Sequence, residues 1–109
     1  MIKEFEKEVI RWVCGNEYPP EFIDKILDNP ERIEVNDSGA GQYDLNVFHP
    51  KLSDDLIVCE NTAFGICDGI KVGFMATIRN KCIELECYMI NGVSIPKTIR
   101  QSNVVLSKT

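Results

Sequence analysis

Histidine is scarce in this sequence, and closely spaced cysteine pairs are missing. There is one histidine, His49, and no two of the five cysteines form a Cys-x-x-Cys pair. A structural zinc site needs closely spaced cysteines and histidines, so we expect no metal and no other cofactor. Most of the cysteines lie in apolar, strand-like runs, which predicts buried free thiols in a reducing compartment. The five are Cys14, Cys59, Cys67, Cys82 and Cys87.

Long hydrophobic runs are missing as well. No segment approaches the roughly 18 consecutive apolar residues of a membrane-spanning helix. The N-terminal stretch MIKEFEKEVI is charged throughout and lacks the apolar core of a secretory signal. We therefore expect a cytoplasmic protein that makes no contact with a membrane.

Two patterns suggest a catalytic dyad or a phosphate-binding loop, and both are incomplete. His49 could form a catalytic dyad with Cys59 or Cys67, but a reactive thiolate needs a partly exposed, electropositive site, and these cysteines lie in apolar runs. The Gly-Ala-Gly segment at 39–41 lacks the lysine and hydroxyl of a phosphate loop, and a strand pattern follows it instead of a helix. The sequence therefore predicts a hairpin turn there, no catalytic residue, and a protein that is not an enzyme.

Acidic residues outnumber basic ones by 17 to 12, which gives a net charge of −5. The excess belongs to residues 1–50, which hold eleven acids and five bases. Such a surface repels phosphate backbones and disfavours direct nucleic-acid binding. It would attract a basic protein and speed the encounter, although negative charge also serves solubility alone.

The N-terminal third has helical periodicity. At 109 residues the chain is expected to form one domain. Residues 2–14 carry an apolar stripe at helical spacing, and Gly15-Asn16 is a suitable stop. A second amphipathic segment, 21–27, can be opened by Pro20 and is ended before Pro30. These two segments predict a helical hairpin.

The rest of the chain alternates with a period of two. Strand patterns at 32–36 and 42–48 flank a glycine-rich turn, and a third begins at 56–59. The clearest pattern is 67–89, where two apolar runs lie on either side of Asn80-Lys81, and it predicts the central hairpin of the sheet. Asn91-Gly92 then marks a turn, and the short segments 93–95 and 104–106 are candidate edge strands.

Helices followed by antiparallel strands are typical of the α+β class. We expect an N-terminal helical hairpin packed on an antiparallel β-meander of about five strands. One face of the sheet should be covered by the helices, and the other should face water.

The last strand of the predicted hairpin has a polar face. Glu84, Glu86 and Tyr88 share it, because they are two residues apart. The acids could pair with Arg79 and Lys71 on a solvated face, act as acid and base in a glycosidase-like site, or bind a lysine or arginine of a partner. Asp24 and Asp28, four residues apart, share a face of the second helix. The predicted partner-binding residues are Asp24, Asp28, Asp44, Glu84, Glu86 and Tyr88.

Short motifs between residues 30 and 100 resemble those of a small bacterial α+β family without assigned activity. That family has two helices, a glycine-rich turn between two strands, and a hairpin that contains Asp-Gly-Val and Leu-x-Glu-Leu patterns. The corresponding stretches here are DSGAGQ at 37–42, DGIKV at 68–72 and CIELE at 82–86.

The chain as a whole resembles the small acidic immunity proteins of bacterial polymorphic-toxin and contact-dependent inhibition systems. This resemblance implies a protein that binds and neutralises one cognate toxin domain, often a basic nuclease, by occluding its active or substrate-binding surface. The alternatives are a non-catalytic module that binds a small ligand or has a regulatory role, and a small hydrolase that uses His49.

Overall fold

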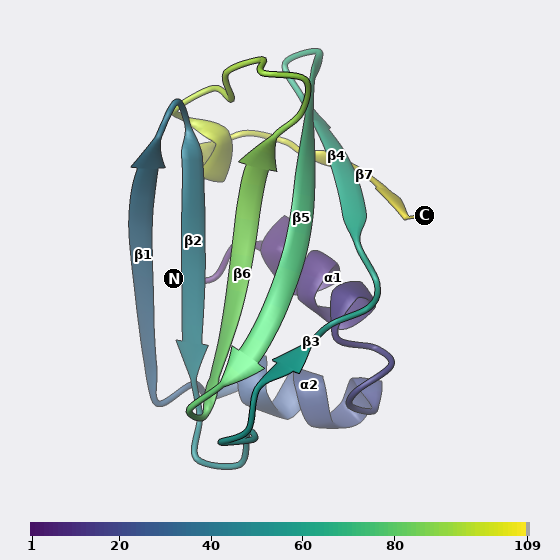
Figure 1. Cartoon of the computed structure of the whole chain (residues 1–109), viewed down its shortest axis with the longest axis vertical. Helices are drawn as coiled ribbons and strands as arrows, with labels where there is room; N and C mark the ends of the chain where they lie inside the picture. The colour runs from purple at the N-terminus through teal and green to yellow at the C-terminus, as the bar shows by residue number, and fades with distance from the viewer. Residues whose placement is uncertain (109) are drawn as a thin grey trace.

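The computed structural model describes residues 1–108, in which two helices pack against one face of an antiparallel sheet (Figure 1). The α+β class and the helix-covered sheet expected from the sequence are confirmed. The helices are α1 (Glu4–Val13) and α2 (Pro20–Asp28), and a short 3-10 helix, η1 (Ile99–Gln101), lies near the C-terminus. The strands are β1 (Arg32–Gly39), β2 (Gln42–Phe48), β3 (Ile57–Val58), β4 (Ala63–Cys67), β5 (Ile70–Arg79), β6 (Cys82–Met89) and β7 (Val105–Lys108).

The sheet has seven strands, more than the expected five or so, and they do not follow chain order. Their spatial order is β1-β2-β6-β5-β4-β7, and the short β3 pairs with β5 beside this path. After β2 the chain crosses toward the opposite edge of the sheet, where it forms β3 and β4. It then returns through β5 to β6, which pairs with β2. This crossover makes β2 and β6 neighbours although 33 positions separate the end of one from the start of the other.

The predicted central hairpin exists, but it is shorter than 67–89. Asn80 and Lys81 form its turn with φ of +51° and +58°, the left-handed conformation that two-residue hairpins require. At the other end, Asp68 and Gly69 adopt φ of +51° and +78° and make a second turn, between β4 and β5. Cys67 therefore belongs to β4.

Two other strand predictions need correction. The pattern beginning at 56 divides into β3 and β4 because the intervening segment contacts the end of α1: Asn61 Nδ2 donates to the Trp12 carbonyl at 3.0 Å. Residues 93–95 form no strand, and Ile95 N donates instead to the carbonyl of Ala40 in the β1–β2 turn at 2.9 Å. The C-terminal candidate is confirmed as β7, which pairs with β4.

The core lies between the helices and the covered face of the sheet. Phe74, Leu45 and Leu85 are fully buried in it, together with Ile10 and Ile23 of the two helices. All five cysteines are buried and unbridged. No helix within residues 1–108 has the length and apolarity needed to cross a membrane.

Candidate functional site

The face of the sheet opposite the helices is the candidate site, and we call it the open face. It is the face turned toward the viewer in Figure 1, with α1 and α2 behind the sheet. Alternation along β2 and β6 buries one set of side chains and leaves Asp44, Glu84 and Glu86 on this face. Strand pairing brings together residues that are about 40 positions apart in the sequence.

Asp44 and Glu86 lie directly opposite each other across β2 and β6. On the outer sides of this pair stand Asn36 of β1 and Met75 of β5, neither of which carries a charge. Like charges in directly opposed positions of an antiparallel pair destabilise a sheet. The pair therefore needs an explanation other than the stability of the fold.

The arginines of the open face pair with other acids. Arg79 Nε lies 2.7 Å from Glu84 Oε2, as the sequence predicted, and Arg32 Nε lies 3.0 Å from Glu34 Oε2. Within the described residues, neither Asp44 nor Glu86 forms an ion pair.

The predicted pairing of Lys71 with Glu86 is wrong. The lysine ammonium lies over the ring of Phe64, 4.4 Å from its centroid. The residue of β5 opposite Glu86 is Met75. Lys71 stands four residues away along β5, about 13 Å, which is too far for an ion pair.

The surroundings of Asp44 disfavour its charge. Partial burial raises the pKa of the Asp44 carboxyl, and the nearby negative charge of Glu84 raises it further. Beside it on β2, the side-chain oxygen of Asn46 is enclosed and accepts no hydrogen bond from the described part of the chain. This part of the open face, which we call the acidic half, thus holds acceptors that receive no hydrogen bond from residues 1–108, on Asp44, Asn46 and Glu86, beside Glu84, which pairs with Arg79. Its members are Asp44, Asn46, Glu84 and Glu86.

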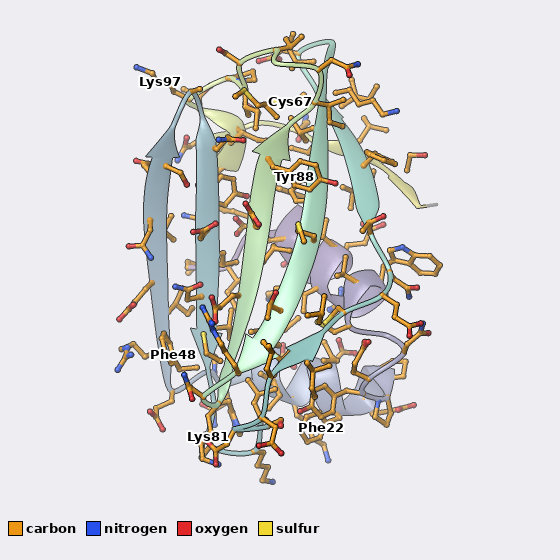
Figure 2. The ribbon with its side chains drawn as sticks, viewed as in Figure 1. Phe22, Phe48, Cys67, Lys81, Tyr88 and Lys97 are labelled. Carbon is orange, nitrogen blue, oxygen red and sulfur yellow. The ribbon has the colours of Figure 1, made fainter. Side chains whose placement is uncertain are left out.

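Tyr88 lies flat on the sheet beside the acidic half. Its ring crosses Gly73 of β5, where a Cβ would stand 2.3 Å from Tyr88 Cζ, and Figure 2 shows the ring on the side turned toward the viewer. Its hydroxyl has no hydrogen-bond partner among residues 1–108. Because Gly73 has no side chain, the Tyr88 ring can lie against β5, and its hydroxyl is available on the open face.

Apolar side chains continue the open face across β5, β4, β3 and β7. Sequence reasoning missed this region, which we call the apolar half, because its strands are paired by the crossover and by the C-terminal segment. The signals in the sequence were the separate strand patterns at 56–59, 67–89 and 104–106, which do not indicate that these strands share a face. Its apolar members are Val58, Phe64, Ile66, Met75 and Val105, and the charged Lys71 lies among them, opposite Ile66 and over the ring of Phe64.

The other two predicted partner-binding residues lie away from the open face. Asp24 and Asp28 are on α2, behind the sheet. Asp24 forms an ion pair with Arg11 of α1. The six predicted residues thus divide into four on the open face and two on the helical side, and a single flat contact cannot cover both groups.

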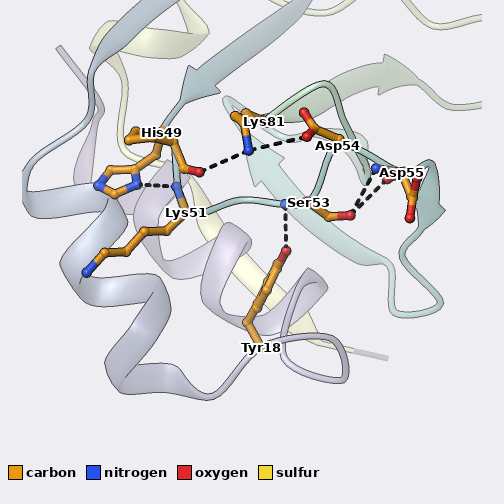
Figure 3. Close-up of polar contacts among 8 residues, drawn as sticks. Tyr18, His49, Lys51, Ser53, Asp54, Asp55 and Lys81 are labelled. Atoms are coloured by element: carbon orange, nitrogen blue, oxygen red, sulfur yellow. Dashed lines mark hydrogen bonds and ion pairs between the residues drawn. The ribbon is translucent and has the colours of Figure 1, made fainter.

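His49 lies in the loop after β2 (Figure 3). Its Nδ1 accepts a hydrogen bond from the backbone N–H of Lys51 at 3.1 Å. Among the residues described, neither a cysteine nor a carboxylate is bonded to the imidazole, and the thiol of Cys59 contacts Cys14 instead. The structure does not assemble the dyad of His49 with Cys59 or Cys67.

Polar contacts connect this loop both to the sheet, through the β5–β6 turn, and to the segment between the helices. Lys81 Nζ bridges the Asp54 carboxylate at 3.3 Å and the Pro50 carbonyl at 3.2 Å, and Ser53 N donates to the Tyr18 hydroxyl at 3.1 Å (Figure 3). In residues 1–108, no group of three or more histidine, cysteine, aspartate or glutamate side chains is placed to hold a metal ion.

Among the residues that the structure describes, one acid, Glu6, is fully buried. Glu6 accepts hydrogen bonds from Tyr43 Oη at 2.7 Å, from Arg100 Nε and Nη2 at 2.8 and 2.9 Å, and from Lys3 N at 2.8 Å. This network joins α1, β2 and η1 and fixes the C-terminal segment against the N-terminus. With every contact made within the chain, it has a structural role.

Comparisons with protein-family models, with curated protein sequences and with solved structures find no match for this chain.

Proposed function

We propose that this protein is an immunity protein that binds a cognate bacterial toxin domain, a nuclease, and neutralises it by occluding its active or substrate-binding surface. The observation that carries the proposal is the unpaired Asp44–Glu86 couple on the open face. The nearest arginines are engaged by other acids, so the couple is free to receive a cation from outside.

A lysine or arginine placed between the two carboxylates would form charge-assisted hydrogen bonds and relieve their repulsion. A surface that binds nucleic-acid phosphates is rich in such side chains, so a nuclease offers the matching charge. The net charge of −5 would speed the encounter of the two proteins.

The test is binding to, and protection from, a toxin domain encoded immediately upstream of the gene for this chain. The double variant D44N/E86Q removes two charges from the open face, and D24N/D28N removes two from α2 as a matched control. We expect the open-face variant to associate at least about tenfold more slowly at low salt and with weaker salt dependence, and we expect the control to change much less.

A wild-type protein that neither binds this toxin nor protects cells that express it would refute the proposal. Binding that is independent of salt and unaffected by D44N/E86Q would refute the role of the acidic couple.

A second candidate is a module that binds a small ligand. A cleft of about 600 Å³ lies between α2 and the loop after β2, with Phe22 and Ile26 among its lining residues and His49 and Lys51 on the loop side. Ligand sites commonly have such volumes. Acidic residues of α2 line the opposite wall, so the charges of the two walls largely balance. The cleft does not account for the unpaired acids of the open face, which is why we favour the toxin-binding role.

A further inference from the structure

The cleft between α2 and the loop after β2 has walls that hydrogen bonds and packing hold in place. On the loop side, His49 N donates to the Lys81 carbonyl at 3.0 Å. On the helix side, the ring of Phe22 stacks on Tyr18 with centroids 4.7 Å apart. Ser53 N of the loop donates to the Tyr18 hydroxyl and so joins the two walls. A ligand therefore meets a cleft that is already formed, which lowers the cost of binding.

The floor of the cleft is apolar. Ile26 is 1% exposed and Phe22 is half-buried, and both are lining residues. The volume of about 600 Å³ equals that of a sphere about 10 Å across. Apolar side chains with a few polar groups around them are the usual lining of a small-ligand site.

Charged side chains of both signs line the cleft and do not pair with one another. They are Glu21, Lys25 and Asp28 of α2 and Lys51 of the loop. Within residues 1–108 none of the four forms an ion pair or a side-chain hydrogen bond, although Glu21 and Lys25 have the spacing and order that favour a pair on a helix. The charge of Asp28 also acts on Arg11, which leaves Glu21 as the acid of the cleft that a ligand can pair.

His49 adds a hydrogen-bond donor to the loop wall. Its Nδ1 accepts from Lys51 N at 3.1 Å, so the neutral imidazole carries its hydrogen on Nε2. Nε2 has no partner in the described part of the chain. The ring and the Lys51 side chain lie on the same side of the loop (Figure 3), and both line the cleft. An N–H donor and an ammonium on one wall are suited to a carboxylate.

We infer that this cleft binds a small zwitterion with an apolar side chain, of the class of the apolar amino acids. Lys51 and His49 Nε2–H bind the carboxylate of the ligand, and Glu21 binds its ammonium. The apolar side chain of the ligand packs on Phe22 and Ile26.

Both the charges and the size of the cleft favour a zwitterion. A ligand with a single charge would pair with one wall and be repelled by the other. In an amino acid the ammonium and the carboxylate are about 3 Å apart, and a hydrogen bond of about 2.8 Å on each side extends the span to about 9 Å. The same two groups end a short peptide, where each added residue lengthens the span by about 3.5 Å.

This inference does not rest on the toxin-binding role. Asp44 precedes His49 by five residues, which corresponds to about 17 Å of extended chain. The cleft is therefore separate from the acidic couple of the open face, and no toxin is needed to test it.

The first test is an NMR titration of the full chain with L-leucine, N-acetyl-leucine and leucinamide. The two blocked compounds keep the side chain, and each lacks one of the charges. We expect L-leucine to shift the amide signals of Phe22, His49 and Lys51. Its Kd should be at least about tenfold lower than that of either blocked compound, because each of them loses a charge-assisted hydrogen bond. Titration with leucyl-leucine shows whether the free amino acid or a short peptide is the better ligand.

The second test compares two matched double variants. E21Q/K51Q removes one charge from each wall of the cleft, and E31Q/K97Q makes the same substitutions at exposed positions outside it. Both variants keep the net charge of −5, and all four positions are on the surface, so both should fold. We expect E21Q/K51Q to weaken L-leucine binding at least about tenfold and the control to stay within about twofold.

Three results would overturn the inference. They are equal affinities for L-leucine and its blocked forms, equal effects of the two double variants, and no shift in the cleft at about 10 mM L-leucine or leucyl-leucine. Tighter binding of leucyl-leucine than of L-leucine would uphold the zwitterion and identify a short peptide as its source. Failure of these tests leaves the toxin-binding role intact, and failure of toxin binding leaves the cleft as a ligand site.

Discussion

Glu6 and the Asp44–Glu86 couple are carboxylates in opposite situations. Glu6 is fully buried and accepts four hydrogen bonds, two of them from Arg100. Asp44 and Glu86 are on the open face, opposite each other, and have no ion-pair partner in the described part of the chain. The carboxylate of Glu6 is the hardest to keep charged because it is buried, and it has four hydrogen-bond donors. The carboxylates of Asp44 and Glu86 are easier to hydrate, and no donor within residues 1–108 contacts them.

This difference separates an acid that stabilises the fold, Glu6, from two acids that do not. Burial of a charge without donors would prevent folding, so selection for stability is sufficient to explain the Glu6 network. An exposed couple of like charges weakens the sheet slightly and is tolerated only because water screens it. Binding of a cation from a partner would explain why the Asp44–Glu86 couple is present.

The largest expected effect is at the buried acid. Glu6→Gln removes the charge that balances Arg100, whose side chain is 17% exposed, and should lower the free energy of unfolding by about 3 kcal/mol in urea denaturation. The control is Glu4→Gln, on the same helix, where the carboxylate is 89% exposed and the loss should stay below about 1 kcal/mol. Equal effects of the two variants would contradict the structural role of Glu6.

An intermediate effect is expected at Tyr43 and should depend on pH. Burial raises the pKa of the Tyr43 phenol, and the negative charge of Glu6 raises it further. The phenol therefore stays protonated in the folded state, whereas in the unfolded chain it ionises near pH 10. Its contribution is fully present below that pH, and each pH unit above it should cost about 1.4 kcal/mol of stability.

Tyr43→Phe tests this by unfolding at a series of pH values. The variant should be about 1–2 kcal/mol less stable at pH 7, because Glu6 loses a donor, and its stability should fall less steeply above pH 10. Tyr88→Phe, on the open face, is the control for loss of a phenol. A variant that follows the wild-type slope would show that Tyr43 is not the group that ionises.

The smallest effect should have the opposite sign. The raised pKa of Asp44 means that folding disfavours its charge. The penalty is absent below the ordinary aspartate pKa of about 3.9 and is present at neutral pH. Asp44→Asn should therefore raise the free energy of unfolding by up to about 1 kcal/mol at pH 7, and the gain should vanish near pH 3.

The same substitution should weaken binding to the toxin, so that stability and affinity change in opposite directions. Glu34→Gln, which removes an acid with an arginine partner on the same face, is the control and should not stabilise the fold. Destabilisation by Asp44→Asn at pH 7 would mean that the carboxylate has a structural partner.

Local patterns predicted most elements of the fold. Pro20 and Asn29 bound α2 because proline can open a helix and Asn29-Pro30 cannot continue one. The alternation of β2 predicts the observed bounds, 42–48, since Tyr43, Leu45 and Val47 all face the core. The turn at Asp68-Gly69 was overlooked because the apolar pattern runs through it.

The candidate site was predicted only in part. Alternation placed Glu84, Glu86 and Tyr88 on one face of β6, and the structure agrees. No local pattern could indicate that Asp44 stands opposite Glu86, that Lys71 lies over Phe64, or that Asp24 is behind the sheet. These facts depend on which strands become neighbours.

The sequence by itself determined the class of this protein, its acidic character, its two helices and the inward or outward direction of side chains along each strand. These properties follow from composition and from periodicity within a few residues. Only the tertiary structure decided that β2 pairs with β6 and that β7 pairs with β4. Those pairings join segments far apart in the chain through burial of a shared core. They create the acidic couple of Asp44 and Glu86 and, on other strands, the apolar pair of Ile66 and Val105.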